Sequence, residues 1–431
     1  MKMKNSIWNL VWVCLLCSCN SWLDIKLINQ SEESELFSTE RGFSEALAGV
    51  YYDMSAAGLY GQTLSFGMLD VMSRTYDYSR VPNAMKIFRD YDYEDKDMEA
   101  YIYSIWYALY ANIAALNNIL EWSDKNASVL SDARRNQVRG EALALRAMHH
   151  FDIYRLFAPD VKRLPKADGI PYNKQFGVSL PPMYSCEETI QLIINDLLEA
   201  ERCLANDPIT KVVPYEIVSV KEDGGTIIDA DAKDAADQYV ARINLYAVKA
   251  MLARAYQARG EYTKAIEKAN EVINSGKFRL LEFSSIDQSE TSVDKLFSDE
   301  HVFALRNREL GNYSTALHHT KVSGGVTSFA PLPFDNVASM YESNNDDVRY
   351  AKWFDLGSFT KFLSDSTNVY YPKMAMIKLS EMYLLVAECS YHKNPAQSLK
   401  SINELRNHRI RNNQEWTSIT QSYIFDEMKR E

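Results

Sequence analysis

The chain has 431 residues, and its 47 Lys and Arg against 58 Asp and Glu give a formal net charge of -11 at pH 7. Such a chain lacks the basic surface that nucleic-acid phosphates require, so we expect no nucleic-acid partner. Hydrophobic residues make up 46%, which is enough for a large core. After the first 20 residues the cysteines are Cys186, Cys203 and Cys389, and this odd number without a C-x-x-C spacing predicts neither a disulfide framework nor a zinc site.

The first residues have the pattern of a secretory leader. Lys2 and Lys4 make the N-terminus positive, and residues 10–17 are apolar. This apolar stretch is shorter than the ~20 residues that a membrane-spanning helix needs, and no later segment is apolar for long enough. We therefore expect residues 1–18 to be a signal peptide, with a buried core helix as the alternative.

The leader ends in LCSC at residues 16–19, which resembles the bacterial lipobox. In that motif the last cysteine receives the lipid. The pattern predicts lipidation of Cys19, with plain secretion as the alternative, and a lipidated tether over residues 19–38. A lipid anchor of this kind holds a protein on a membrane without spanning it.

Amphipathic helices follow the tether. Apolar residues recur at helical spacing in several segments, and the segments carry capping or stop signals. Thr39 is placed to cap the first helix, Ser185 and Glu188 form a capping box, and Pro159 ends a helix. The expected helices cover 39–54, 101–122, 137–157 and a stretch that begins after Ser185.

Two later segments each predict a pair of packed helices. Residues 243–276 read as two helices joined at Gly260, and residues 376–410 have the same layout with Asn394-Pro395 at the turn. Small residues followed by a tyrosine after the turn look like a tetratricopeptide repeat. We expect an all-α dominated, tetratricopeptide-like helical-repeat scaffold, with an ordinary helical bundle as the alternative.

Two stretches interrupt the helical pattern. Residues 216–234 alternate apolar and polar side chains around Asp223-Gly224, which predicts a small β-hairpin. Residues 277–372 show little helical periodicity and many Gly, Ser, Asn and aromatic residues. Irregular loops of that length in a folded domain are usually functional.

Catalytic and metal motifs are missing from the sequence. It contains no nucleophile elbow, no phosphate-binding P-loop, no H-E-x-x-H and no motif that fixes a pair of carboxylates. His149 and His150 are adjacent on a helix and therefore point to different faces. Asp229, Asp231 and Asp234 could hold Ca²⁺, but they lack the glycine turn and distal glutamate of an EF-hand. We expect no enzymatic activity, no cofactor and no metal site.

Several short motifs follow the lipobox in a fixed order. They are WLD at 22–24, WYALYANIAALN at 106–117, GEA with RA at 140–147, the repeat at 250–280, KLSE with AE at 378–388, and INELR at 402–406. Together they resemble the motifs of the SusD/RagB family. The resemblance runs from Cys19 to the last residue, with two small departures: Cys389 replaces a small residue, and the gap before Pro165 is long. The chain also stops in IFDEMKRE where the family continues, so we expect the family's C-terminal segment to be lacking.

The resemblance implies a fold and a role. Members of the family are surface lipoproteins with a tetratricopeptide-like scaffold, here the domain 39–431, and with ligand-binding loops at about 65–95 and 277–372. They sit on the outer membrane over a TonB-dependent transporter and bind glycans or peptides without cleaving them. We therefore expect a lipid-anchored protein that captures oligosaccharides for such a transporter, with a peptide or protein interaction scaffold as the alternative.

The resemblance and the residue types together predict a sugar site. Aromatic rings stack on the C–H faces of sugars, and fixed polar groups bind hydroxyls. Trp353, Tyr370 and Tyr371 are alternatives that no motif selects, and packing residues of long loops are the other interpretation. The predicted ligand-binding residues are Asp70, Arg74, Tyr76, Tyr78, Asn312, Tyr313 and Phe329, with Tyr76, Tyr78 and Tyr313 as the aromatic face and Asp70 as an acceptor for hydroxyls.

Overall fold

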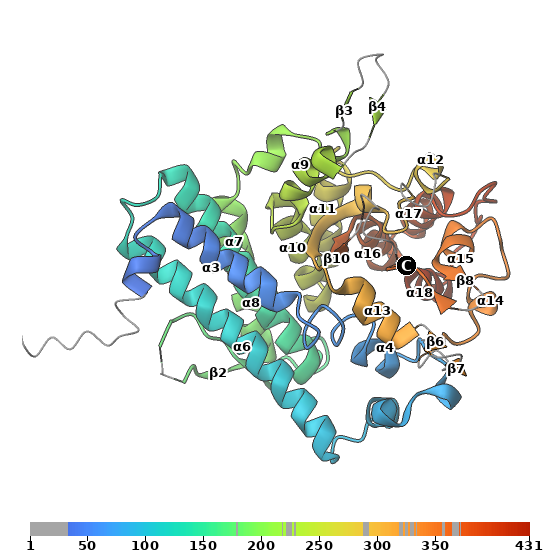
Figure 1. The fold of residues 1–431 in the computed structure, drawn as a ribbon, viewed down its shortest axis with the longest axis horizontal. Helices are drawn as coiled ribbons and strands as arrows, with labels where there is room; N and C mark the ends of the chain where they lie inside the picture. Colours follow the sequence, from blue (N-terminus) through green and yellow to red (C-terminus); the bar gives the residue numbers. More distant parts are fainter. Residues whose placement is uncertain are drawn as a thin grey trace, which may run out of the picture.

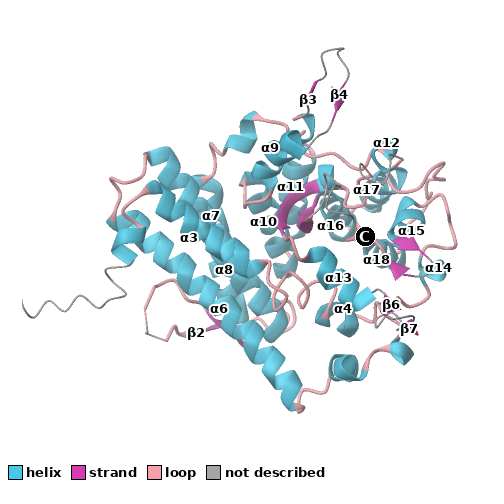
Figure 2. Cartoon of the chain, viewed as in Figure 1, coloured by secondary structure: helices cyan, strands magenta, loops and turns pink. Residues whose placement is uncertain are grey.

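Helices dominate the computed structural model, and the strands form only short pairs (Figure 2). The predicted all-α dominated, tetratricopeptide-like fold is confirmed. No helix among the described residues is long and apolar enough to cross a membrane. The structure describes residues 33–177, 180–217, 219–220, 226–227, 230–287, 293–318, 322–323, 326–327, 332, 334–355, 358–363, 370 and 372–431.

The first half of the chain packs as a layer of long helices (Figure 1). Local signals set their ends, because the Thr39 hydroxyl accepts from the Gly42 N–H at 3.1 Å and Ser185 with Glu188 forms the predicted capping box. The helix predicted from residue 137 begins earlier, at Asp132, since Ser131 caps it. α6 packs on α7, and α7 on α8. The bounds are α3 Glu40–Met54, α6 Lys96–Lys125, α7 Asp132–Phe157 and α8 Cys186–Cys203.

Both predicted helix pairs are present and continue the layer. Gly260 joins the first pair at φ 84, a left-handed conformation that glycine adopts without strain. α10 packs on α8 and α11, and α11 packs on α16, so the pairs stack into one array. The second pair begins only at Leu379, because the residues before it form a strand. The bounds are α10 Leu245–Arg259, α11 Tyr262–Ile273, α16 Leu379–Ser390, α17 Pro395–Asn407 and α18 Gln421–Arg430.

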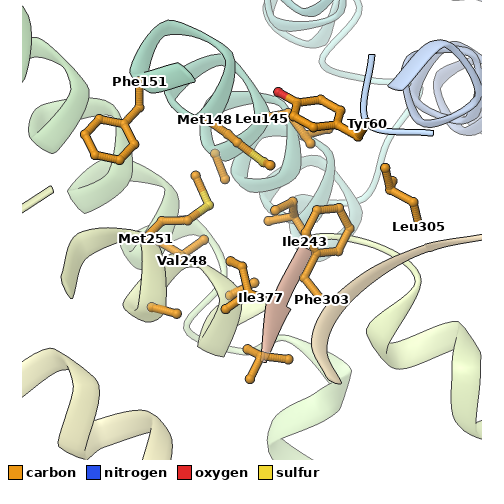
Figure 3. Close-up of a cluster of buried hydrophobic side chains, with 14 of the residues drawn as sticks. Tyr60, Leu145, Met148, Phe151, Ile243, Val248, Met251, Phe303, Leu305 and Ile377 are labelled. Atoms are coloured by element: carbon orange, nitrogen blue, oxygen red, sulfur yellow. The ribbon is translucent and has the colours of Figure 1, made fainter. Parts of the chain in front are cut away.

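A two-stranded antiparallel sheet crosses the inside of this array. β5 (His301–Arg306) pairs with β10 (Lys373–Lys378). Its buried residues Phe303, Leu305 and Ile377 pack against α7 and α10 (Figure 3). The Asn307 N–H donates to the Pro372 carbonyl at 3.1 Å, so the chain leaves the core and returns to it at one place.

The chain between β5 and β10, residues 307–372, leaves the core and returns to it, and we call it the excursion. Short elements form among its described residues and in the loops earlier in the chain. β3 (Ser219–Val220) and β4 (Thr226–Ile227) pair antiparallel on either side of the predicted hairpin turn, and the turn itself lies outside the described residues. The remaining elements are α4 Met68–Met72, α5 Lys86–Asp90, β1 Asp168–Pro171, β2 Met183–Ser185, α9 Ala230–Val240, α12 Phe283–Ile286, α13 Leu310–His318, β6 Val322–Ser323, β7 Val326–Thr327, α14 Val337–Met340, α15 Val348–Trp353, β8 Phe354–Asp355 and β9 Ser358–Phe359.

A buried cluster of ion pairs joins the excursion to the helical array. Arg349 of α15 and Arg409 have no exposed surface. Arg349 contacts Glu427 and Glu431 at 2.7 Å each, and Arg409 contacts Glu431 at 2.6 Å and Glu300 at 2.7 Å. Burial alone would raise the pKa of Glu431, but Arg409, Lys378 and Arg349 hold it well below its usual range. The cluster also includes Asp347, Lys378, Arg406 and Arg430.

Arg349→Met tests how much this cluster contributes to stability. The substitution leaves Glu427 and Glu431 buried with fewer cations, and breaking a buried pair in this way costs about 3–5 kcal/mol. We expect a loss of that size in the free energy of unfolding, measured by urea denaturation. The matched control is Arg41→Met, because the Arg41–Glu45 pair is exposed at 87% and 53% and should contribute less than about 1 kcal/mol. Equal losses in the two variants would contradict a stabilising role for the cluster.

Candidate functional site

Two segments far apart in the sequence meet beside α4 and α13. Tyr76 and Phe334 form a backbone bridge, and the Asp335 N–H donates to the Thr75 carbonyl at 3.2 Å. The rings of Phe66 and Phe362 lie 5.3 Å apart, centroid to centroid. The early loop and the 334–362 part of the excursion therefore form one surface.

A pocket of about 730 Å³ lies where these segments and α18 come together, and we call it the aromatic pocket. Its walls carry many phenylalanines, and several rings lie within 6 Å of one another, such as Phe334 and Phe354 at 5.2 Å. It is lined by Ser65, Phe66, Asp70, Ser73, Thr75, Phe334, Met340, Tyr341, Trp353, Phe354, Phe359, Lys361, Phe362, Met374, Phe425, Met428, Lys429, Arg430 and Glu431.

Asp70 is the acidic group of this pocket that has no cationic partner in contact. It lies on α4, and its carboxylate makes no hydrogen bond or ion pair with any described residue, whereas its backbone carbonyl accepts from the Thr75 N–H. Burial raises the pKa of Asp70 to about 7, and Lys361 opposes this shift only in part. A partly desolvated carboxyl without partners is a strong acceptor for a ligand hydroxyl.

Lys361 supplies the opposite charge. Its Nζ lies 3.7 Å from the centroid of the Trp353 ring, a cation–π contact. It forms no ion pair or hydrogen bond with the described residues. Burial and the nearby Lys378 lower the pKa of Lys361 well below its usual value. By contrast, Glu431 and Arg430 at the same wall are held in the ion cluster and are not free for a ligand.

A second cavity, of about 490 Å³, lies between α7, α10 and β10. Its arginines and acids satisfy one another. Arg254 contacts Glu381 at 2.6 Å, and Asp152 accepts from the Tyr60 hydroxyl at 2.6 Å and pairs with Arg155. Because these side chains already have partners, the aromatic pocket is the better candidate.

Tyr76, predicted to form part of the aromatic face, lies in the core. It is 1% exposed, and its hydroxyl donates to the Phe66 carbonyl at 2.6 Å and contacts His318 Nε2 at 2.9 Å. Its ring packs on Phe334. Tyr76 therefore joins the two segments and offers no ring face to a sugar.

Of the other predicted residues that the structure describes, Asp70 lines the aromatic pocket, and Arg74, Tyr78, Asn312 and Tyr313 do not. Arg74 stacks over the Tyr78 ring at 5.0 Å, and the Tyr78 hydroxyl donates to the Val71 carbonyl at 3.2 Å. On α13, Asn312 is exposed and donates to Glu309, and Tyr313 is half-buried. The structure does not bring these residues into one cluster with Asp70 at the pocket wall.

Among the remaining candidates, Phe329 and Tyr371 lie outside the described residues. Tyr370 is buried under Lys233, whose Nζ lies 5.3 Å from the ring centroid. Trp353, an alternative that no motif selected, does line the pocket, with its ring covered by Lys361.

Sequence reasoning missed Phe354, Phe359, Lys361 and Phe425. The first three lie in a run dense in aromatic residues, YAKWFDLGSFTKF at 350–362, and this density is the signal that could have found them. No local sequence pattern marks Phe425 as a pocket residue, because only the tertiary fold brings α18 to the pocket.

A further pair of exposed rings lies elsewhere, on α6. Tyr103 and Tyr107 stack with centroids 6.2 Å apart and planes 19° apart. Neither lines the aromatic pocket.

Asp70→Asn tests the electrostatics of the pocket. Because burial raises the pKa of Asp70 from 3.8 to about 7, the folded state favours the protonated carboxyl, and wild-type stability falls as pH rises from about 4 to about 7. We expect the stability of the variant relative to wild type to be higher at pH 8.5 than at pH 4, by up to about 4 kcal/mol. Asp53→Asn, at an exposed position on α3, is the control and should show no such pH dependence. Parallel pH profiles for Asp70→Asn and wild type would contradict a buried, unpaired carboxyl.

Comparisons with known proteins agree with this fold. A family model described as "Starch-binding associating with outer membrane" matches residues 21–219, and a model described as "SusD family" matches residues 318–431. Among curated proteins no relative matches the chain.

Solved structures share the fold at low identity. A SusD superfamily protein from Bacteroides thetaiotaomicron is 18% identical, with a TM-score of 0.66 over 91% of this chain and 86% of that chain. A SusD-like carbohydrate binding protein from Bacteroides vulgatus is 18% identical, with a TM-score of 0.65 over 91% and 80%. Surface glycan-binding protein A from Bacteroides uniformis is 16% identical, with a TM-score of 0.62 over 91% and 85%.

The two family models match the N-terminal helices and the C-terminal excursion and helices of one continuous fold. The order of motifs, the helical array and the structural neighbours lead to the same assignment. The chain belongs to the SusD/RagB family.

Proposed function

We propose that this protein binds oligosaccharides at the cell surface, without cleaving them, and delivers them to a TonB-dependent transporter of the outer membrane. The observation that carries the proposal is the aromatic pocket, which combines open phenylalanine rings with two charged groups that form no ion pair or side-chain hydrogen bond with the described residues. Membership of a family whose model is described as starch-binding and associated with the outer membrane supports both the ligand class and the location.

The pocket has the chemistry that sugar recognition needs. A sugar presents C–H faces to aromatic rings and hydroxyls to hydrogen-bonding groups. Phe334 and Phe354 are half-buried, and Phe425 of α18 is 43% exposed, so their rings are accessible from the pocket. Asp70 has unused acceptor capacity at the opposite segment. We expect a sugar that stacks on one of these phenyl groups to donate a hydroxyl hydrogen bond to Asp70.

The pocket residues favour binding over hydrolysis. Glycoside hydrolysis uses two carboxyl groups that flank the scissile bond. The lining contains Asp70 and Glu431, and Glu431 is engaged by Arg349 and Arg409. The described wall thus offers one free carboxyl where hydrolysis needs two.

Four residues predicted from the sequence lie outside the pocket, on two segments. Arg74 and Tyr78 lie on the segment that follows α4, and Asn312 and Tyr313 lie on α13. We propose that they contact the units of a longer glycan beyond the pocket, with Phe329 as a further predicted contact.

The alternative function, a peptide or protein interaction scaffold, would use a groove along the helix pairs lined by free Asn, Arg and Lys side chains. Arg254 lines the cavity between α7, α10 and β10, and Lys378 lines an adjoining pocket that shares Glu381 with it; both side chains are paired with carboxylates. The geometry therefore favours the oligosaccharide proposal.

Phe425→Ala tests the pocket as the glycan site. Loss of one stacking ring should weaken binding about tenfold, because such a contact contributes about 0.5–1.5 kcal/mol beyond its buried area. Retention in affinity gels that contain soluble starch, xylan, mannan or pectin measures the effect. Since the side chain is 43% exposed, we expect little change in the thermal melt.

Phe176→Ala is the matched control for this experiment. Phe176 is 40% exposed and does not line the pocket, so its truncation should leave retention unchanged. A Phe425→Ala variant that is retained as strongly as Phe176→Ala on every retaining glycan would show that the pocket is not the binding site.

Cys19→Ala tests the lipid anchor. Cys19 lies outside the described residues, so the lipobox alone supports this part of the proposal. In a bacterial host with the lipoprotein machinery, metabolic labelling with a palmitate analogue should label the wild type and Cys17→Ala, and the label should be lost in Cys19→Ala. Label that persists after Cys19→Ala would exclude this residue as the anchor.

A further inference from the structure

We propose that the aromatic pocket selects an acidic sugar, and that Lys361 binds the anionic group of that sugar. This inference rests on the proposed function and narrows its substrate class. The chemistry that fits is the carboxylate of a uronic acid, with a sulfate ester as the other source of an anion that the experiment below separates.

Lys361 forms no ion pair or hydrogen bond with the described residues. A lysine ammonium carries three donors and no acceptor. One side of it packs on Trp353, with Nζ 3.7 Å from the ring centroid, and the described protein supplies no acceptor for its donors. Burial and Lys378 therefore lower the pKa of Lys361, and a ligand anion in the pocket would stabilise the charged ammonium and remove this cost.

Two other charged groups on the pocket wall already have partners within the protein. Arg430 is bound to Glu427, Glu342 and the Met340 carbonyl, so it has little capacity left for a ligand. Glu431 is likewise neutralised by the ion cluster. The groups that remain available are Lys361, the exposed Lys429 and Asp70.

Among the described residues of the pocket wall, Asp70 is the acid without an ion-pair partner, and its negative charge, when ionised, would repel an anionic ligand. Its carboxyl is substantially protonated near neutral pH, because burial raises its pKa to about 7. A protonated carboxyl is a hydrogen-bond donor as well as an acceptor and does not repel an anion. Among the described residues of the pocket wall, the charged groups without an ion-pair partner are thus two lysines and an acid that burial protonates more readily than usual, although the whole chain is acidic.

The aromatic walls favour a sugar acid over a free inorganic anion as the ligand of the pocket. Rings such as Phe354 and Phe425 have no role in binding a bare phosphate or sulfate, whereas they can stack on the ring that carries a carboxylate. The lysine then fixes the orientation of the sugar, since its position on Trp353 leaves only one side of the ammonium free.

The test uses pairs of probes that differ only in charge. Oligogalacturonides, alginate oligosaccharides and hyaluronan oligosaccharides are each compared with their methyl esters, and chondroitin sulfate oligosaccharides with their desulfated form. We expect the wild-type protein to bind at least one free uronic acid about tenfold more tightly than its ester, measured by calorimetry. Lys361→Gln should lower the affinity for the free acid to that for the ester and leave the affinity for the ester unchanged. Lys361→Arg should retain part of the preference for the free acid.

The matched control is Lys125→Gln, because Lys125 also lies on a tryptophan, 5.2 Å from the Trp122 ring centroid, but on α6 away from the pocket. It should keep the full preference. A preference for sulfated over desulfated probes, with none among the uronates, would assign the ligand anion to a sulfate ester and overturn the carboxylate.

The remaining outcomes separate this inference from the proposed function. If the wild type binds neutral glycans through Phe425 but binds acids and esters equally, or if Lys361→Gln weakens both forms alike, the selection of an acidic sugar is overturned and glycan binding stands. If the folded wild type binds none of the charged or neutral probes, the proposed function fails and this inference fails with it.

Discussion

The arrangement of this protein depends on two arginines that have no contact with water. Arg349 and Arg409 pair with Glu427, Glu431 and Glu300 inside the protein. Removing so many charges from water is costly, so the cluster is favourable only when α15, α18 and the end of α17 are all in place. It therefore couples the correct position of the irregular excursion to the correct packing of the last helices, and both carry pocket residues.

The position of the pocket depends on this coupling and on how the two ends of the excursion are held in the core. β5 and β10 hold both ends of the excursion in the core, so the residues between them can be irregular without loosening the helical array. Tyr76 and His318 then join the excursion to the early loop, and Phe354 and Phe359 pack near that junction. These contacts position the rings, while Asp70 and Lys361 form no ion pair or side-chain hydrogen bond with the described residues.

Local chemistry explains which parts of the structure could be predicted. Helix ends and helix pairs could be predicted from the sequence, because Thr39, the Ser185–Glu188 capping box and Gly260 act on the residues beside them. Tyr76 was predicted as a ligand contact, but it bonds to His318, 242 positions away, and this contact makes it a core residue. Asp70, which lines the pocket, was selected because the sequence at 70–80 is rich in polar and aromatic residues. Lys361 and Phe425 were not, because only the tertiary fold places them at one pocket.

The central claim is that the aromatic pocket between α4, the 334–362 segment and α18 holds the glycan. A crystal structure of the protein with a bound oligosaccharide, chosen as the one retained most strongly in affinity gels, tests this claim most directly. The account predicts a sugar ring stacked against Phe354 or Phe425, with a hydroxyl within hydrogen-bond distance of Asp70. A glycan bound only elsewhere, for example on the stacked Tyr103 and Tyr107 of α6, with the aromatic pocket empty, would contradict it.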